Sequence, residues 1–409
     1  MVDKKGFIWN MFGSIVYSLF SAIILAFCTR LNGLEISGIF SIAYATSCIL
    51  NAIGEFGIRI FQTTDTDRKY KFCDYISARI FCVIFMIIGT FGIVIISGYT
   101  SFKLWICLLL VAYRIIDNIS EAYQAEFQLQ NRLDIGGKSV LYRNIFSICA
   151  FILIDILTKN IILSCFGMVF VNLAIFVFYD LRLIKLFIND RFKFRKKNAI
   201  LIIKEVLPIA ISSILNVYVI NATKYAIDKV GNNVMQTYFN IIYMPTFAIN
   251  LVSIFIIRPF LKPFAEYYNK NEYTKLKIIT LKILVALIAV TMLIEIFCYI
   301  FGVPILNMLY SVNIDEYKFD LLILIISGMF YAISNLFFNL LSTIRKQKYI
   351  TYTYLLIMVI SYIVPNIFVS KMNMRGAVIA NTIIMSALCF VLMFFYKIGI
   401  SERRKEKYV

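Results

Sequence analysis

The chain of 409 residues contains no histidine, and only 16% of its residues are charged. Without histidine, the protein has neither histidine-ligated metal sites nor histidine proton relays. Its nine cysteines are scattered through apolar stretches and show no Cys-x-x-Cys spacing. The sequence therefore predicts small buried cysteines rather than a disulfide or metal framework, and we expect neither a metal ion nor a cofactor.

Hydrophobic residues make up 61% of the chain, and the mean hydropathy is +0.82. A soluble domain contains about 45–50% apolar residues. A helix needs about 20 apolar residues to cross a hydrocarbon core of about 30 Å, and stretches of this kind follow one another along the whole chain. They cover residues 7–29, 36–57, 76–98, 104–123, 140–158, 161–181, 200–222, 234–257, 278–300, 319–341, 350–370 and 376–397. The sequence predicts an all-α polytopic membrane protein with twelve transmembrane helices.

The formal net charge of +18 is spread along the chain rather than gathered in one patch, which argues against a nucleic-acid partner. Most of the 41 lysine and arginine residues fall on alternate connections between the apolar stretches. Because basic residues favour the cytoplasmic side of a membrane, we expect both termini in the cytoplasm. We expect a multi-pass protein of the cytoplasmic (inner) membrane, with membrane lipids around it.

The most basic connection, residues 182–204, divides the predicted helices into two groups of six. We predict an N-terminal six-helix lobe, 1–190, and a C-terminal six-helix lobe, 191–409, around a central cavity. Two such halves are a common plan among transporters. The external connections are too short to hold a catalytic domain, so we predict that the protein is not an enzyme.

The predicted helix 104–123 and its extension carry a stripe of polar and charged residues at steps of three and four. The stripe consists of Arg114, Asp117, Glu121, Gln124 and Gln128, with Asn118 beside it. Three charges facing lipid would cost roughly 2.5–3.5 kcal/mol each, whereas each Leu, Ile or Val returns only about 0.3–0.6 kcal/mol. The stripe must therefore face protein or water. It is either an internal lattice of ion pairs or the lining of a cavity, and the two roles can overlap.

Charged residues also mark the predicted ends of helices two and three. Glu55 and Arg59 are four residues apart, so that they can pair on one helical face. Arg79 lies in the first turn of the predicted helix 76–98. For both arginines, the alternative to a cavity position is a side chain that reaches from the helix end to the membrane interface.

Four further residues are candidates in other helices. Asp155 and Glu295 are single acids, each of which would either bind a coupling ion or lie exposed or paired at the interface. Asn216 belongs to a polar face of the predicted helix 200–222, and Arg258 ends the predicted helix 234–257. The prolines of these two helices, Pro208 and Pro245, allow bending, and static kinks explain them equally well.

Three runs in the N-terminal half resemble Wzx-type polysaccharide repeat-unit flippases of the multidrug/oligosaccharidyl-lipid/polysaccharide exporter superfamily. They are GIFSIAYA (38–45), FGIRIFQTTDTDRKYKFCDYISARI (56–80) and AEFQLQNRLDIGGKSVLYR (125–143). The resemblance covers residues 8–185 and implies six plus six helices around a cationic cavity. The family motif positions fall on Arg59, Gln62, Asp65, Asp74, Tyr75, Arg79, Asp117, Gln124, Arg132, Asp134, Gly137 and Lys138.

The resemblance implies a flippase for capsule, O-antigen or exopolysaccharide synthesis. Its substrate would be an undecaprenyl-diphosphate-linked oligosaccharide that moves from the inner to the outer leaflet by alternating access. The expected partners are a polysaccharide polymerase and a chain-length regulator. Arg59, Arg79, Arg114 and Arg258 would then neutralise the diphosphate. The alternatives are a cation-coupled multidrug exporter of the same fold and a membrane polysaccharide polymerase or glycosyltransferase.

Overall fold

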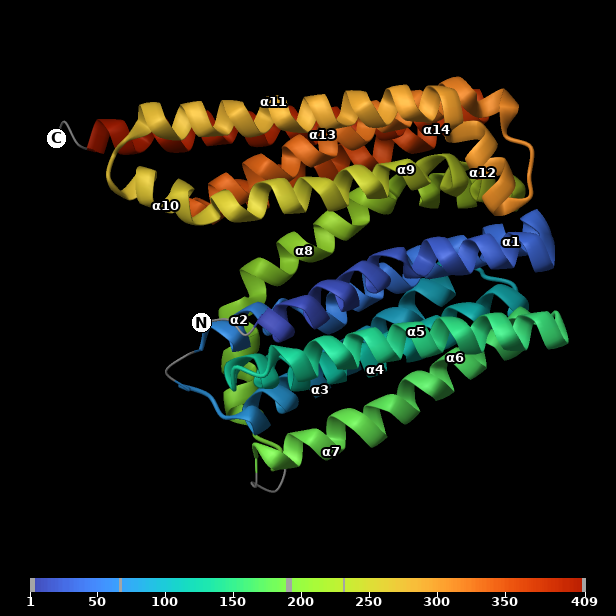
Figure 1. The fold of residues 1–409 in the computed structure, drawn as a ribbon, viewed down its shortest axis with the longest axis horizontal. Coiled ribbons are helices and arrows are strands. Elements are labelled where there is room, and N and C mark those ends of the chain that lie inside the picture. The colour runs from blue at the N-terminus through green and yellow to red at the C-terminus, as the bar shows by residue number, and fades with distance from the viewer. Residues whose placement is uncertain (1–3, 66–67, 189–192, 231, 407–409) are drawn as a thin grey trace. The chain divides into compact units, whose positions relative to one another are not determined.

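The computed structural model describes residues 4–65, 68–188, 193–230 and 232–406, and this part of the chain consists of helices and short connections, without strands (Figure 1). Nine of its helices are long and apolar enough to cross a membrane. The predicted all-α polytopic membrane fold is therefore confirmed. The chain forms two compact units, Met1–Val217 and Tyr218–Val409. The predicted lobe boundary at residue 190 and the orientation in the membrane stay predictions.

The first unit contains the helices that surround the candidate site. They are α1 (Lys4–Glu55), α2 (Ile58–Thr64), α3 (Phe72–Ser97), α4 (Ser101–Leu129), α5 (Leu133–Thr158) and α6 (Ile161–Ile175). A π-helical turn η1 (Phe176–Asp180), α7 (Leu181–Leu183) and a 3₁₀ turn η2 (Ile184–Leu186) continue α6. The long helix α8 (Lys196–Val230) leads into the second unit.

The second unit is a bundle in which α13 packs against α9, α11 and α14. Its elements are α9 (Asn233–Ile257), η3 (Arg258–Phe260), α10 (Leu261–Asn269), α11 (Tyr273–Phe297), η4 (Cys298–Gly302), α12 (Val303–Tyr310), η5 (Asp315–Tyr317), α13 (Lys318–Thr343) and α14 (Gln347–Glu406). The helix α11 continues through the π-helical turn η4 into α12, so the predicted span 278–300 is part of a longer helical segment.

Two predicted connections are sharp kinks. Gly33 interrupts α1 with φ 85° and ψ 176°, a conformation that is essentially restricted to glycine, and Asn373 interrupts α14 with φ 50°. Each kink separates two of the predicted spans. The helix α4 carries too many charges to count among the nine apolar helices. When α4 is added and the two kinked helices are each counted as two, the described chain has a helix for each of the twelve predicted spans. That all twelve cross the bilayer stays a prediction.

The core of the first unit lies where α1 packs against α3, α4 and α5, and where α5 and α4 contact α6. Phe20 of α1 stacks on Tyr113 of α4, Phe40 of α1 contacts Phe151 of α5 with tilted rings, and all four side chains are buried. Such aromatic side chains each bury a large apolar surface. The apolar packing fixes α1, α4 and α5 next to one another, and these helices supply most of the site.

Candidate substrate cavity

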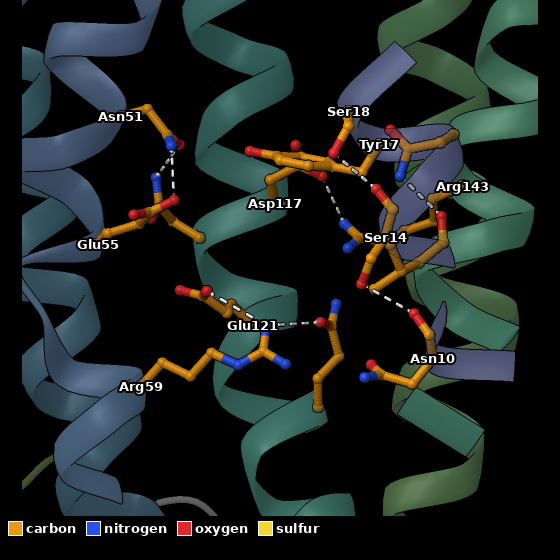
Figure 2. Close-up of a pocket in the computed structure, with 14 residues that line it drawn as sticks. Asn10, Ser14, Tyr17, Ser18, Asn51, Glu55, Arg59, Asp117, Glu121 and Arg143 are labelled. Carbon is orange, nitrogen blue, oxygen red and sulfur yellow. Dashed lines mark hydrogen bonds and ion pairs between the residues drawn. The ribbon is translucent and has the colours of Figure 1, made fainter. Parts of the chain in front are cut away.

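A cavity of about 220 Å³ lies within the first unit, and all but one of its lining side chains are polar (Figure 2). Helices α1, α2, α4 and α5 all contribute to it. The lining consists of Asn10, Ser14, Tyr17, Ser18, Asn51, Glu55, Arg59, Asp117, Asn118, Glu121, Gln124, Val140, Arg143 and Asn144. The middle of the charged stripe of α4, from Asp117 to Gln124, thus faces a polar cavity.

Glu121 holds two arginines of different exposure at one end of the cavity. Its Oε1 lies 3.3 Å from Nη1 of Arg59, and its Oε2 lies 2.7 Å from Nη2 of Arg79. Arg79 is fully buried and also donates to the backbone carbonyls of Gly54 and Glu55. The side chain of Arg59 is 35% exposed, and it points into the cavity (Figure 2). Arg79 therefore fixes Glu121, while Arg59 remains accessible to a ligand.

Asp117 holds a second pair of arginines further along α4. It lies 2.7 Å from Nη1 of Arg143, on α5, and 3.6 Å from Nη1 of Arg114, one turn before it on α4. Arg114 also donates to the hydroxyls of Tyr17 and Tyr44, at 3.2 and 2.8 Å. The stripe is therefore both an ion-pair lattice and a cavity lining, so that the two interpretations of the sequence describe one structure.

Glu55 and Arg59 were predicted to pair, but the described contacts include no ion pair between them. The helix is broken between them, because Phe56 and Gly57 adopt positive φ angles of 46° and 70°. Glu55 instead accepts a hydrogen bond from Asn51 at 2.7 Å, and Asn51 in turn accepts one from Asn118. The break turns Arg59 towards Glu121 on α4.

The charges of this connected cluster are unequal in number. It contains the guanidinium groups of Arg59, Arg79, Arg114 and Arg143 and the carboxylates of Glu55, Asp117 and Glu121. With all of these groups ionised, the cluster has a net charge of one positive unit. Because only Arg59 combines this charge with substantial exposure, it is the group that an anion would meet first.

Several motif positions tie the helices together instead of lining the cavity. Buried Gln62 donates to the carbonyl of Ala122 at 3.1 Å, which fixes α2 on α4. Asp65 accepts hydrogen bonds from the backbone of Lys69 and Tyr70. Asp74 accepts a hydrogen bond from the backbone of Lys71 at the N-terminus of α3, and Arg132 pairs with Asp134 at 2.8 Å at the N-terminus of α5. These side chains fix the connections on both sides of the cavity.

Among the predicted site residues whose side chains are described, Arg79, Arg114, Asp155, Asn216 and Glu295 do not line this cavity. Arg79 and Arg114 are bound to the lining residues Glu121 and Asp117. Asp155 is buried on α5, where it accepts hydrogen bonds from Asn32 at 2.6 Å and Ser164 at 3.3 Å. Asn216 lies on α8, and the half-buried Glu295 lies on α11 of the second unit. The side chain of Arg258 lies outside the described part of the chain.

Two predicted helix boundaries differ in the structure, which changes where Arg79, Gln124 and Gln128 lie in their helices. The helix α3 begins at Phe72, so Arg79 lies about two turns inside it rather than in its first turn. The helix α4 continues to Leu129, beyond the predicted end at 123, and it therefore includes Gln124 and Gln128. Gln124 is buried at the cavity, whereas Gln128 is exposed.

Arg143 and the polar face of α1 were not among the predicted site residues. Arg143 is 3% exposed, and it follows Ser139 and precedes Ser147 at steps of four, a spacing that would have shown a buried polar face. Asn10, Ser14 and Ser18 repeat at the same step near the start of α1. Among the described residues, no three histidine, cysteine or acidic side chains are placed to hold a metal ion.

No family model and no curated sequence matches the chain. Solved structures do. An inward-facing multidrug resistance MATE family transporter of the MOP superfamily superposes with a TM-score of 0.73 at 13% identity, over 95% of this chain and 96% of the other. The fold is that of the MATE transporters. A MATE structure in the bent conformation gives a TM-score of 0.61 at 13% identity over 100% of both chains.

A further similar structure is a MOP superfamily transporter from Pyrococcus furiosus. Its TM-score is 0.58 at 15% identity, and the match covers 96% of this chain and 94% of the other. That protein is described as having a binding pocket of reversed polarity that suggests a different function. At these identities the similarity concerns the fold, and the substrate has to be inferred from the cavity of this chain.

Proposed function

We propose that this protein is an alternating-access membrane transporter and that it moves an anionic, lipid-linked oligosaccharide across the membrane, as Wzx-type flippases do. The observation that carries the proposal is the accessible guanidinium of Arg59 in a polar cavity, where the connected cluster of lining and supporting side chains contains four arginines and three carboxylates. The MATE-type fold supports the transport part of the proposal. The runs in residues 38–143 that resemble Wzx-type flippases support the substrate class.

The electrostatics of the cavity suit a diphosphate. A phosphate group leaving water needs charge-assisted hydrogen bonds, and guanidinium groups provide them in a fixed planar fork. Arg59 can leave Glu121 without stranding its carboxylate, because Arg79 remains bound to the other oxygen at 2.7 Å. A membrane potential that is negative inside favours outward movement of an anion, by about 2.3 kcal/mol for each charge and each 100 mV.

A second candidate is a cation-coupled multidrug exporter of the same fold. The comparisons favour it, because the similar structures include proteins named as multidrug resistance MATE transporters. In this chain, however, each of Asp117 and Glu121 is already bound to two arginines. A cationic drug would have to displace these arginines, which favours the anionic substrate. The reversed pocket polarity of the Pyrococcus furiosus protein supports a change of function within the fold.

The two candidates differ in the phenotype of a strain that lacks the gene. The flippase function predicts that surface polysaccharide is lost and that lipid-linked repeats accumulate inside the cell. It also predicts that the wild-type gene restores export, whereas Arg59→Gln does not. The exposed Arg375, in the second unit, provides the control Arg375→Gln at matched protein level. Normal polysaccharide together with increased drug sensitivity would instead establish the exporter.

A further inference from the structure

A groove of about 430 Å³ lies in the second unit, and the proposed function does not use it. Its walls come from the first half of α11 and the C-terminal part of α14. Both helices pack on α13, and the buried Phe337 of α13 lines the groove between them. The ring of Phe337 contacts Tyr396 of α14, with 5.4 Å between the ring centroids. The volume lies within the range of about 300–1,000 Å³ that is usual for small-molecule pockets.

The lining of the groove changes from basic to apolar along the helices. One end is formed by the start of α11 and the last turns of α14, and it carries Lys277 and Lys397. Further from this end the lining consists of Leu281 and Leu284 of α11 and Met393 of α14. The hydroxyl of Thr280, between the two parts, already donates to the backbone carbonyl of Leu276 at 2.8 Å. The groove therefore offers a charged end and an apolar continuation to one amphipathic ligand.

The two lysines of the groove lack compensating charge within the described part of the chain. Neither Lys277 nor Lys397 has an ion-pair or hydrogen-bond partner among the described residues. Two acids of the adjoining segments are already occupied, because Glu272 is bound to Lys275 at 3.1 Å and Glu402 to Lys346 at 2.7 Å. Like charges that line one groove repel each other. An anion between them would remove this repulsion and accept charge-assisted hydrogen bonds from both ammonium groups.

The helices on both sides of the groove are suited to hydrocarbon surroundings. Both α11 and α14 belong to segments that are long and apolar enough to cross a membrane. On α11 the exposed side chains beside the groove include Ile278, Leu281 and Val285. The charge pattern of the sequence predicts the C-terminus, and with it the basic end of the groove, on the cytoplasmic side. Basic pockets between membrane helices on that side bind anionic lipid head groups.

We propose that this groove is a binding site for one anionic phospholipid. Its phosphate lies between Lys277 and Lys397, and one acyl chain follows Leu284 and Met393 along the groove. The lipid thereby joins α11 to α14, in addition to the contacts that each helix makes with α13. A zwitterionic lipid fits the apolar part equally well but leaves the two ammonium groups without a net negative partner. The site is separate from the polar cavity of the first unit, and the proposal does not depend on the transported substrate.

Native mass spectrometry of the purified protein tests the preference for the head group, with phosphatidylglycerol and phosphatidylcholine of identical acyl chains as probes. Each lysine beside the phosphate contributes about fivefold, so the wild type should bind phosphatidylglycerol about twentyfold more tightly. Lys277→Gln and Lys397→Gln should each weaken this binding about fivefold. The matched control is Lys282→Gln, because Lys282 is an exposed lysine of α11 that does not line the groove. Equal binding of both lipids, or equal effects of Lys277→Gln and Lys282→Gln, would overturn the proposal.

The position of the lipid is tested on the wild type in nanodiscs, with phosphatidylglycerol that carries a photoreactive diazirine in one acyl chain. Peptide mapping should place the cross-links on Leu281, Leu284 and Met393, and an excess of unlabelled phosphatidylglycerol should suppress them. Cross-links spread evenly over the apolar helices would contradict a defined site. Stronger suppression by polyprenyl phosphate than by phosphatidylglycerol would assign the groove to a polyprenyl lipid and also overturn the proposal. Neither measurement uses transport, so a failure of the flippase function leaves both results unchanged.

Discussion

Asp117 of α4 and Arg143 of α5 form an ion pair of 2.7 Å in which Arg143 is 3% exposed and Asp117 14%. The pair joins the two helices at the wall of the cavity (Figure 2). The remaining oxygen of Asp117 lies 3.6 Å from Arg114. One carboxylate therefore holds two guanidinium groups, and each of them depends on it for charge compensation.

Removing one partner of this pair should destabilise the protein more than removing both. Asp117→Asn leaves the guanidinium groups of Arg114 and Arg143 without their carboxylate, and Arg143→Gln leaves Asp117 with only the more distant Arg114. Loss of one partner of a buried ion pair typically costs about 3–5 kcal/mol. The double variant should recover part of this loss. Thermal unfolding of the purified proteins in detergent measures all three variants, and the double-mutant cycle isolates the pair. Strictly additive effects would show that the pair does not contribute as a unit.

The two adjacent glycines of α5 should respond differently to alanine. A Cβ on Gly137 would lie 2.4 Å from the backbone nitrogen of Asn10, so it would force α1 away from α5 at the cavity. A Cβ on Gly136 would meet nothing closer than 3.6 Å. We expect Gly137→Ala to cost about 1–3 kcal/mol. Gly136→Ala should gain about 0.5–1 kcal/mol from helix propensity.

The same thermal unfolding measurement distinguishes these glycine variants. Because Asn10 lines the cavity, Gly137→Ala should also weaken anion binding, whereas Gly136→Ala should not. Equal stability of the two variants would contradict the close approach of α1 and α5. The glycine pair thus tests the helix packing that shapes the cavity.

Asp65 gives the loop between α2 and α3 a defined pH dependence. Burial raises its pKa, but hydrogen bonds from the backbone of Tyr70, the hydroxyl of Tyr75 and the backbone of Lys69 outweigh burial and hold the pKa below its usual value. For a carboxyl with a lowered pKa, the stabilisation is present at neutral pH and is lost as the pH falls through the folded-state value. The loop should therefore loosen below about pH 4.

Hydrogen exchange of the amides of Lys69 and Tyr70 measures this loosening after correction for intrinsic rates. The wild type should protect both amides near neutral pH and lose this protection in acid. Asp65→Asn should reduce the protection already at neutral pH, because the amide offers only one acceptor oxygen. Protection that is equal in both proteins at every pH would show that the carboxylate does not order the loop.

The membrane fold and the polar face of α4 could be predicted from the sequence alone. Long apolar stretches predict membrane helices because the bilayer sets their length, and the cost of charges in lipid requires that Asp117 and Glu121 face inwards. The bond partners could not be predicted in the same way. Arg143 is paired with Asp117 only because α4 packs on α5, and Gly57 breaks the local spacing between Glu55 and Arg59. Asn10 and Ser14 were missed because single small polar residues disturb an apolar stretch very little.

Transport in proteoliposomes tests the central claim, that Arg59 binds the anionic head group of the substrate, most directly. The assay follows a fluorescent polyprenyl-diphosphate sugar through quenching of the outer leaflet, for the wild type, Arg59→Gln and Arg375→Gln. A charge-assisted hydrogen bond is worth about 1.5–3 kcal/mol, so Arg59→Gln should lower the rate by about tenfold to a hundredfold, while Arg375→Gln keeps it. Flipping by Arg59→Gln at the wild-type rate, or no flipping by the wild type, would contradict the account.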